Sequence, residues 1–197
     1  MKILAVYGST RDDGNTRILA HHIADAAKQQ GAEVEFFDVL REELPLFRTD
    51  RDYKQNALVS SLRQKTSEAD AFIVVSPEYH GCMSNAIKNF FDYHYQQFAG
   101  KAFAIATSTG GSLGVSCNSQ MRIAIQHCHG WALPYQVGAR SAEFVEGKIE
   151  NSKICDRLQR MGRDLVVYGK LLKAQFEQDK AEGATQKEHV GFAGWYV

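Results

Sequence analysis

The sequence lacks several features that would assign it to a class at once. No apolar run approaches the roughly 20 residues that a bilayer-spanning helix needs, and the chain enters its first apolar stretch without the layout of a signal peptide. Its 23 basic residues are balanced by 23 acidic ones, so there is no excess positive charge for binding nucleic acid. The cysteines show no CxxC spacing, as expected of reduced thiols. We therefore expect a cytoplasmic protein that binds neither nucleic acid nor membrane.

Two familiar phosphate-binding motifs are also missing. The stretch from Gly8 to Thr16 has glycines just before a helical pattern, but Asn15 stands where a triphosphate-binding P-loop has its lysine. The same stretch does not match GxGxxG. Both absences weigh against a triphosphate site and against a dinucleotide-binding Rossmann site.

What the chain does have is an alternation of apolar runs with helical patterns. The apolar runs predict strands at residues 2–7, 32–39, 71–76, 102–108 and 131–137, with Pro134 indicating an edge or a bulge in the last. Amphipathic spacing predicts helices at residues 16–30, 55–67, 85–97, about 114–128 and 154–176. This alternation is typical of a parallel sheet covered on both faces. We expect an α/β, flavodoxin-like three-layer sandwich with a five-stranded parallel sheet in the order 2-1-3-4-5.

The loop after the first strand is suited to an anion. Backbone N–H groups at a helix N-terminus bind phosphate without a dedicated side chain, and Gly8 and Gly14 allow close backbone approach. Hydroxyl, amide and guanidinium donors are supplied by Ser9, Thr10, Arg11, Asn15 and Thr16. The alternative is an ordinary turn, with the helix capped by Asp13 or Asn15.

Two more loops follow the third and fourth strands, at the same edge of the predicted sheet. They are Pro77-Glu78-Tyr79-His80-Gly81 and the stretch from Thr107 to Gly114, which contains Ser108, Thr109, Gly110 and Gly111. The strand order reverses between the first and third strands, which opens a crevice there. With the first loop, this pattern points to flavin mononucleotide (FMN). The alternative is three ordinary turns, with Glu78 as a solvated carboxylate.

Short motifs along much of the chain carry a family resemblance. They are Gly8-Ser9-Thr10-Arg11 with Asn15-Thr16, Leu44-Pro45-Leu46-Phe47, Pro77-Glu78-Tyr79-His80-Gly81 and Ile87-Lys88-Asn89-Phe90-Phe91-Asp92. Through them the chain resembles the NADPH-dependent FMN reductase family of the flavodoxin-like superfamily, from the first strand to about Pro134. The chain departs from the family at Met83-Ser84-Asn85, where many members have Pro-Gly, and in the Ser/Thr-rich third loop.

The resemblance also implies which residues bind FMN. The phosphate is expected at Ser9, Arg11, Asn15 and Thr16. The ribityl chain and isoalloxazine are expected at Pro77, Glu78, Tyr79, His80 and Gly81. Further ring contacts are expected at Ser108, Thr109, Gly110 and Gly111.

The implied activity is that of an FMN-dependent oxidoreductase. NAD(P)H would reduce the flavin, and electrons would pass to a small acceptor such as a quinone, an azo compound or a metal oxyanion. The cofactor does this chemistry, so no catalytic side chain is named. Residues 41–67 contain no cysteine, where relatives with an iron–sulfur cluster place theirs, and no metal site is expected. A flavodoxin-type electron carrier without NAD(P)H turnover and a non-redox binding module stay open, as does NADH against NADPH.

The end of the sequence suggests docking and assembly. We expect residues 1–180 to form the FMN-binding domain and residues 181–197 to form a tail, in which a polar stretch leads to Phe192, Trp195 and Tyr196. Burying a Phe-sized side chain gains about 1.5–3 kcal/mol, so the tail is expected to dock on its own domain or on a neighbour. The resemblance adds the expectation of a homodimer or homotetramer with flavin sites near a subunit interface.

Overall fold

The strands predicted from the apolar runs form the central sheet. The computed structural model describes residues 1–11, 14–184 and 191–197. Its strands are β1 (Lys2–Tyr7), β2 (Glu33–Asp38), β3 (Ala71–Tyr79), β4 (Cys82–Met83), β5 (Ala102–Thr109), β6 (Trp131–Ala132), β7 (Val137–Arg140), β8 (Phe144–Val145) and β9 (Lys148–Ile149). Its helices are α1 (Asn15–Gln29), α2 (Ala57–Glu68), α3 (Asn85–Asp92), α4 (Val115–His127) and α5 (Ser152–Gly183), with 3₁₀ turns η1 (Gln96–Phe98), η2 (Ser141–Glu143) and η3 (Gly191–Tyr196).

The order of the strands confirms the predicted topology. In the described part of the chain the main sheet runs β2-β1-β3-β5-β6, and every neighbouring pair is parallel. This is the flavodoxin-like order, with β6 in the place of the fifth strand. The short β4 pairs antiparallel with the end of β3, and β8 and β9 form a separate hairpin.

The fifth strand is interrupted, whereas the sequence pattern predicted one run over residues 131–137. First β6 and then, after a gap, β7 pairs with β5. Pro134 lies in the gap and has no N–H to offer the sheet. Arg122 stabilises the segment between β6 and β7, because its guanidinium donates to the Leu133 carbonyl and to Gln136 Oε1, both at 2.9 Å.

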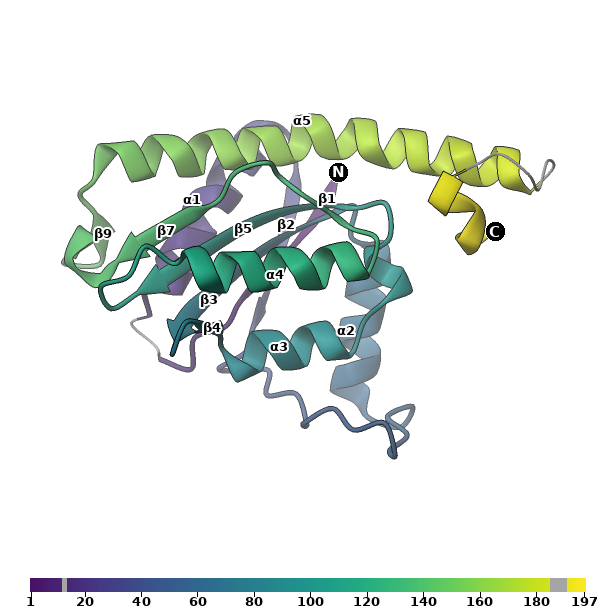
Figure 1. Ribbon diagram of the computed structural model, residues 1–197, viewed down its shortest axis with the longest axis horizontal. Coiled ribbons are helices and arrows are strands. Elements are labelled where there is room, and N and C mark those ends of the chain that lie inside the picture. The colour runs from purple at the N-terminus through teal and green to yellow at the C-terminus, as the bar shows by residue number, and fades with distance from the viewer. Residues whose placement is uncertain (12–13, 185–190) are drawn as a thin grey trace.

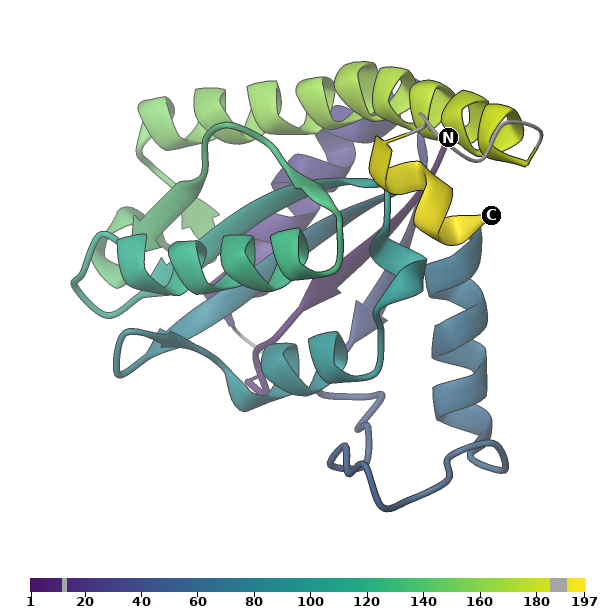
Figure 2. The same cartoon turned by 45° about the vertical axis from the view of Figure 1, so that its right-hand side comes forward.

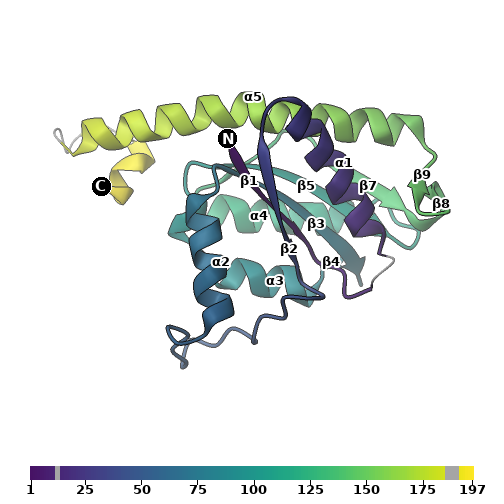
Figure 3. The same ribbon diagram turned by 180° about the vertical axis from the view of Figure 1, so that it is seen from behind.

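Alternate residues of the strands divide the interior into two cores. In β1, Ile3 and Ala5 pack toward α1 and α5, while Leu4 and Val6 pack toward α2, α3 and α4. Figure 1 shows α5 along one side of the sheet and α3 and α4 on the other, and Figure 3 shows α1 beside α5 from behind. Because both faces of the sheet centre are buried, the strands β1, β3 and β5 are almost continuously apolar, which is why the sequence revealed them.

Helix α3 ends at Asp92, although the spacing predicted a helix over residues 85–97. His94 turns into the core, where its Nδ1 hydrogen-bonds to the Phe90 carbonyl at 2.7 Å. The preceding Tyr93 donates its hydroxyl to the Pro45 carbonyl at 2.8 Å. The long-range bond of Tyr93, together with the burial of both residues, overrides the local helical pattern.

The C-terminal segment folds back onto its own chain. Helix α5 runs from Ser152 to Gly183. In η3, the Phe192 ring lies 5.5 Å from that of Phe176, and the Tyr196 hydroxyl hydrogen-bonds to His129 Nδ1. Figure 2 shows η3 below the far end of α5, and Figure 1 places it at the opposite end of the sheet from β4. None of the described helices has both the length and the apolar character needed to cross a bilayer.

Candidate functional site

The first loop leaves β1 and lies directly against α3. The Gly8 N–H donates to the Val75 carbonyl at 2.9 Å, so the loop starts from the end of the β1–β3 pairing. A Cβ at Gly8 would lie 2.2 Å from Ile87 Cγ1 and 2.6 Å from Ser84 Oγ. Only glycine therefore fits where the two elements meet.

Among the described residues, the N-cap of α1 makes no side-chain hydrogen bond to the start of the helix. Its N-cap is Gly14, and Asn15 begins the helix, so a cap by Asn15 is wrong, and Asp13 lies outside the described residues. Within the loop, the Arg11 N–H donates to Ser9 Oγ at 3.2 Å, and the Gly14 N–H donates to the Arg11 carbonyl at 3.2 Å. These bonds fold the loop over the helix end, where N–H groups and the helix dipole favour an anion.

Thr16 carries the clearest sign of a ligand at this helix end. The residue is 1% exposed, and its hydroxyl has no hydrogen-bond partner within the part of the chain that the structure describes. An unpartnered buried hydroxyl costs about 1–3 kcal/mol. The hydroxyl can serve as a donor to an anion at the start of α1.

Arg17 joins this region although the sequence analysis did not select it. Its Nη2 lies 2.8 Å from Asp38 Oδ2, and its guanidinium lies 5.3 Å from the centre of the Tyr7 ring. Burial and the Asp38 carboxylate raise the pKa of Tyr7, partly offset by Arg17. A basic residue in a first helical turn opposes the helix dipole. The first turn of α1 contains no acidic residue. Its basic residue, Arg17, was therefore the sequence signal that could have pointed to a bound anion.

The second predicted loop is largely part of the sheet, which corrects the expectation that β3 ends at residue 76. Pro77 is in register with Ser108 of β5, and Glu78 and Tyr79 pair with β4. Only His80 and Gly81 form the turn, with φ of 53° and 77°. Two residues with positive φ are typical of a type I′ hairpin turn, whose twist matches that of the flanking strands. The hairpin was not predicted from the sequence, because Pro77 suggested that the strand ends there and a loop begins.

Ser84 connects this hairpin to the first loop. Its hydroxyl donates to the Gly8 carbonyl at 3.0 Å and accepts the Ile87 N–H at 3.3 Å as the N-cap of α3. Its own N–H donates to Ser76 Oγ at 2.9 Å. A serine just before an apolar helix is an N-cap signal, but its link to Gly8, 76 residues earlier, has no sequence signature.

The third loop faces the hairpin. The Ser112 hydroxyl donates to Glu78 Oε2, so Glu78 is not simply a solvated carboxylate. Thr109 Oγ1 donates to the Ser112 carbonyl at 2.6 Å, which closes the loop on itself. A Cβ at Gly110 or Gly111 would meet no atom within 4 Å. The glycines therefore present open backbone. Ser112 ties the loop to the hairpin, and no sequence motif marks it for that role.

The carboxyl ends of β1, β3 and β5 thus bring all three loops to one edge of the sheet. The expected residues of each loop lie at this edge. A cavity of about 400 Å³ opens beside the first loop, between the segment after β2 and the start of α3. It is lined by Thr10, Val39, Leu40, Glu42, Glu43, Leu44, Leu46, Asn85, Ala86 and Asn89.

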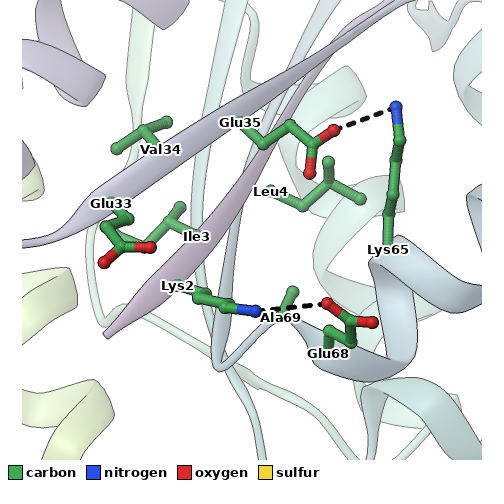
Figure 4. A pocket seen from close by; sticks show the side chains of 9 residues that line it. All are labelled: Lys2, Ile3, Leu4, Glu33, Val34, Glu35, Lys65, Glu68 and Ala69. Atoms are coloured by element: carbon green, nitrogen blue, oxygen red, sulfur yellow. Dashed lines mark hydrogen bonds and ion pairs between the residues drawn. The ribbon is translucent and has the colours of Figure 1, made fainter.

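A second hollow, of about 310 Å³, lies at the opposite, amino edge of the sheet (Figure 4). Two lysines point to carboxylates across it. Lys65 Nζ lies 3.0 Å from Glu35 Oε1, and Lys2 Nζ lies 3.2 Å from Glu68 Oε2. Because open parallel sheets bind ligands at their carboxyl edge and these lysines are already paired, we assign no site to this hollow.

Comparison with known proteins decides the family. The model of the NADPH-dependent FMN reductases matches residues 1–143. The chain belongs to this family. It is 30% identical over 178 residues to an NADPH azoreductase of Bacillus sp. (strain OY1-2), with 88% of this chain and 97% of the relative covered. It is 28% identical over 157 residues to an FMN-dependent NADPH-azoreductase of Staphylococcus aureus (strain USA300), with 75% and 81% covered.

A solved structure shares the fold of this FMN reductase. The flavoenzyme NAD(P)H:(acceptor) oxidoreductase FerB from Paracoccus denitrificans superposes with a TM-score of 0.71 at 19% identity, covering 86% of this chain and 97% of FerB. The chain is therefore an FMN-dependent NAD(P)H oxidoreductase of flavodoxin-like fold, as the sequence predicted. The donors of its first loop suit the phosphate of FMN, because they combine a helix N-terminus that no described side chain caps with the buried Thr16 hydroxyl.

Proposed function

We propose that this FMN reductase binds FMN across its three loops and passes electrons from NAD(P)H to a small acceptor. The single observation that best supports this proposal is the unpartnered Thr16 hydroxyl, buried at the N-terminus of α1 among the described residues. When bound, FMN supplies the hydride and electron chemistry. The chain's own residues hold and orient it.

The proposed phosphate site uses the first loop. Thr16 donates its hydroxyl and Arg11 its charge, and charge-assisted bonds of this kind are about twice as strong as neutral ones. Ser9 and Asn15 complete the donor set.

The proposed ring site lies between the hairpin and the third loop. Its residues are Pro77, Glu78, Tyr79, His80, Gly81, Ser108, Thr109, Gly110 and Gly111. The open backbone at Gly110 and Gly111 supports close approach of a flat heterocycle. The Glu78 carboxylate accepts a hydrogen bond from the Ser112 hydroxyl. In this proposal, Glu78 therefore contacts the ring through its backbone and not through its carboxylate.

The acceptor within this proposal is an azo compound, with quinones and metal oxyanions as members of the same class of small oxidants. The two curated relatives are named as azoreductases, which supports this choice.

We also propose that the enzyme is a cytoplasmic homodimer or homotetramer, built from a domain of residues 1–180 with a docking tail of residues 181–197. An apolar groove of about 690 Å³ between α3 and α4 supports a second copy as partner. Tyr95 and Ile123, which line it, are 52% and 54% exposed. Exposed apolar surface of this kind marks interaction sites. Light scattering should give a multiple of 22.0 kDa, and Ile123→Glu should lower that mass.

The experiment that tests the function combines binding with turnover. The purified protein should bind FMN with a flavin absorbance spectrum and oxidise NADPH or NADH when an azo dye is added. Arg11→Ala should weaken FMN binding by about 1.5–3 kcal/mol, because a bond to the charged phosphate is lost. Arg48→Ala, which breaks only an exposed pair with Asp50, is the matched control. Bound flavin without NAD(P)H oxidation would indicate an electron carrier, and no flavin binding would indicate a non-redox module.

A further inference from the structure

We propose that Ser84 is a positioning residue that holds the phosphate loop and the ring hairpin at the spacing of one FMN molecule. The inference rests on the proposed placement of FMN across these loops. It assigns to Ser84 a part in the preference for FMN over flavins without a phosphate.

Ser84 makes three hydrogen bonds through its hydroxyl and its N–H, and its carbonyl accepts the Lys88 N–H at 2.9 Å. Its hydroxyl donates to the Gly8 carbonyl, at the start of the phosphate loop, and accepts the Ile87 N–H of α3. Its N–H donates to the Ser76 hydroxyl, which in turn donates to the Pro77 carbonyl at 2.8 Å. Ser84 is 1% exposed, and Ser76 is fully buried. One buried residue therefore joins the three elements: its hydroxyl bonds to the phosphate loop and to α3, and its backbone N–H bonds to Ser76, at the base of the hairpin.

The position of Gly8 shows how tightly this junction is set. The regular β1–β3 pairing ends at Tyr7 and Val75, and the Gly8 N–H still bonds to Val75. On its other side, Gly8 has no room for a Cβ, because Ile87 and Ser84 lie too close. The Ser84 bond fixes the Gly8 carbonyl at the point where the loop leaves the sheet.

A ligand that contacts two elements gains from both only when their spacing already matches the ligand. FMN would contact the loop through its phosphate and the hairpin through its ring. Riboflavin has the same ring without the phosphate and would contact the hairpin side alone. Loss of the Ser84 link should therefore weaken FMN binding much more than riboflavin binding.

Glycine is the informative replacement at this position. Gly is a good N-cap, so Ser84→Gly removes the hydroxyl while costing α3 little. Asn56→Gly is the matched control. Asn56 is the N-cap of α2, where its side chain accepts the Val59 N–H at 3.0 Å, and it lies on the segment between β2 and α2, outside the three loops. Ser84→Ala gives a second variant with the same lost link and a weaker cap.

The test is a pair of titrations of the full-length apoprotein with FMN and with riboflavin, below the melting temperature of every variant. Ser84→Gly should raise the Kd for FMN about tenfold and that for riboflavin less than about twofold. Ser84→Ala should give the same ratio at a lower Tm, and Asn56→Gly should change neither Kd.

Equal weakening of both flavins, or none, would overturn the role of Ser84 while leaving the proposed function intact. Failure of the wild-type chain to bind FMN would instead remove the proposed function, and this inference with it.

Discussion

The first turn of α1 and the last turn of α2 each contain a buried threonine without a hydrogen-bond partner for its hydroxyl among the described residues, but the two helix ends lie at opposite edges of the sheet. Thr16 and Thr66 are both buried, and neither hydroxyl has a hydrogen-bond partner in the described segments. Thr16 lies where helical N–H groups emerge, at the carboxyl edge of the sheet. Thr66 lies where helical carbonyls emerge, at the amino edge, and Lys101 already donates to its carbonyl at 2.9 Å. An unpartnered hydroxyl alone therefore does not mark a site, but one at a helix N-terminus has a field that attracts an anion.

The largest effect is expected from glycine substitutions, which should affect FMN binding at the carboxyl edge of the sheet but not at the amino edge. Gly8→Ala should cost about 3 kcal/mol of stability, the upper end for overpacking, and should abolish FMN binding. The new Cβ would collide with Ile87 Cγ1 at the phosphate loop. Chemical denaturation and flavin titration measure the two losses.

Gly100→Ala provides the comparison at the amino edge. Its Cβ would lie 2.2 Å from Phe176 Cγ, so a similar loss of stability is expected. FMN affinity should remain that of the wild type. If Gly100→Ala weakened FMN binding as strongly as Gly8→Ala, the two edges would not be independent.

Acid should destabilise the end of the molecule near His94. Burial lowers the pKa of His94 from 6.5 to about 4, so the folded protein keeps this ring neutral while the unfolded chain protonates below pH 6.5. Stability is fully present above pH 6.5 and falls as the pH drops toward 4, by up to about 3 kcal/mol at 1.36 kcal/mol per pKa unit. Denaturation curves from pH 7.5 to 4 should show this loss, and His94→Phe should flatten the part due to this group.

Substitutions of Thr16 and Thr66 test directly whether the unpartnered hydroxyl at the helix N-terminus binds FMN and the one at the helix C-terminus does not. Thr16→Val and Thr66→Val both replace an unpartnered hydroxyl by a methyl, which should leave the apoprotein as stable or more so. Only Thr16→Val should weaken FMN binding, by about 1.5–3 kcal/mol for a lost bond to a charged group. Equal FMN affinity in the two variants would show that Thr16 does not contact the phosphate.

The smallest effect is expected from the ion pairs of the amino edge. Lys2 and Glu68 are 60% and 50% exposed in their side chains, and exposed pairs contribute about 0.2–1 kcal/mol. Lys2→Ala with Glu68→Ala in a double-mutant cycle should give a coupling energy in that range that shrinks in high salt. FMN binding and turnover should not change.

The parts of the fold that sequence could predict are those with local signals. The continuous apolar runs of β1, β3 and β5 revealed the parallel sheet, because burial on both faces demands such runs. The fifth strand was predicted as one piece, since the break around Pro134 depends on Arg122 contacts that are made only after folding. The early end of α3 has the same origin in the long-range bond of Tyr93 to the Pro45 carbonyl.

The candidate site divides in the same way. Ser9, Thr16 and the glycines could be proposed from the sequence because the donors of a phosphate loop lie within a few consecutive residues. Ser84 and Ser112 escaped because they act on Gly8 and Glu78, which are 76 and 34 residues away. Long-range hydrogen bonds of this kind leave no periodicity in the sequence.

The uninterrupted course of β3 has a consequence for local opening. Binding segments are usually drawn from the least protected parts of a protein. Here Pro77–Tyr79 continue a strand paired on both sides by β1 and β5 in its buried half. Amide hydrogens from Ile73 to Val75 should exchange only on global unfolding, and those of the Glu78–Met83 ladder should be slow for a surface hairpin. The hairpin of the proposed ring site, anchored on this strand, would then open less readily than an ordinary surface loop.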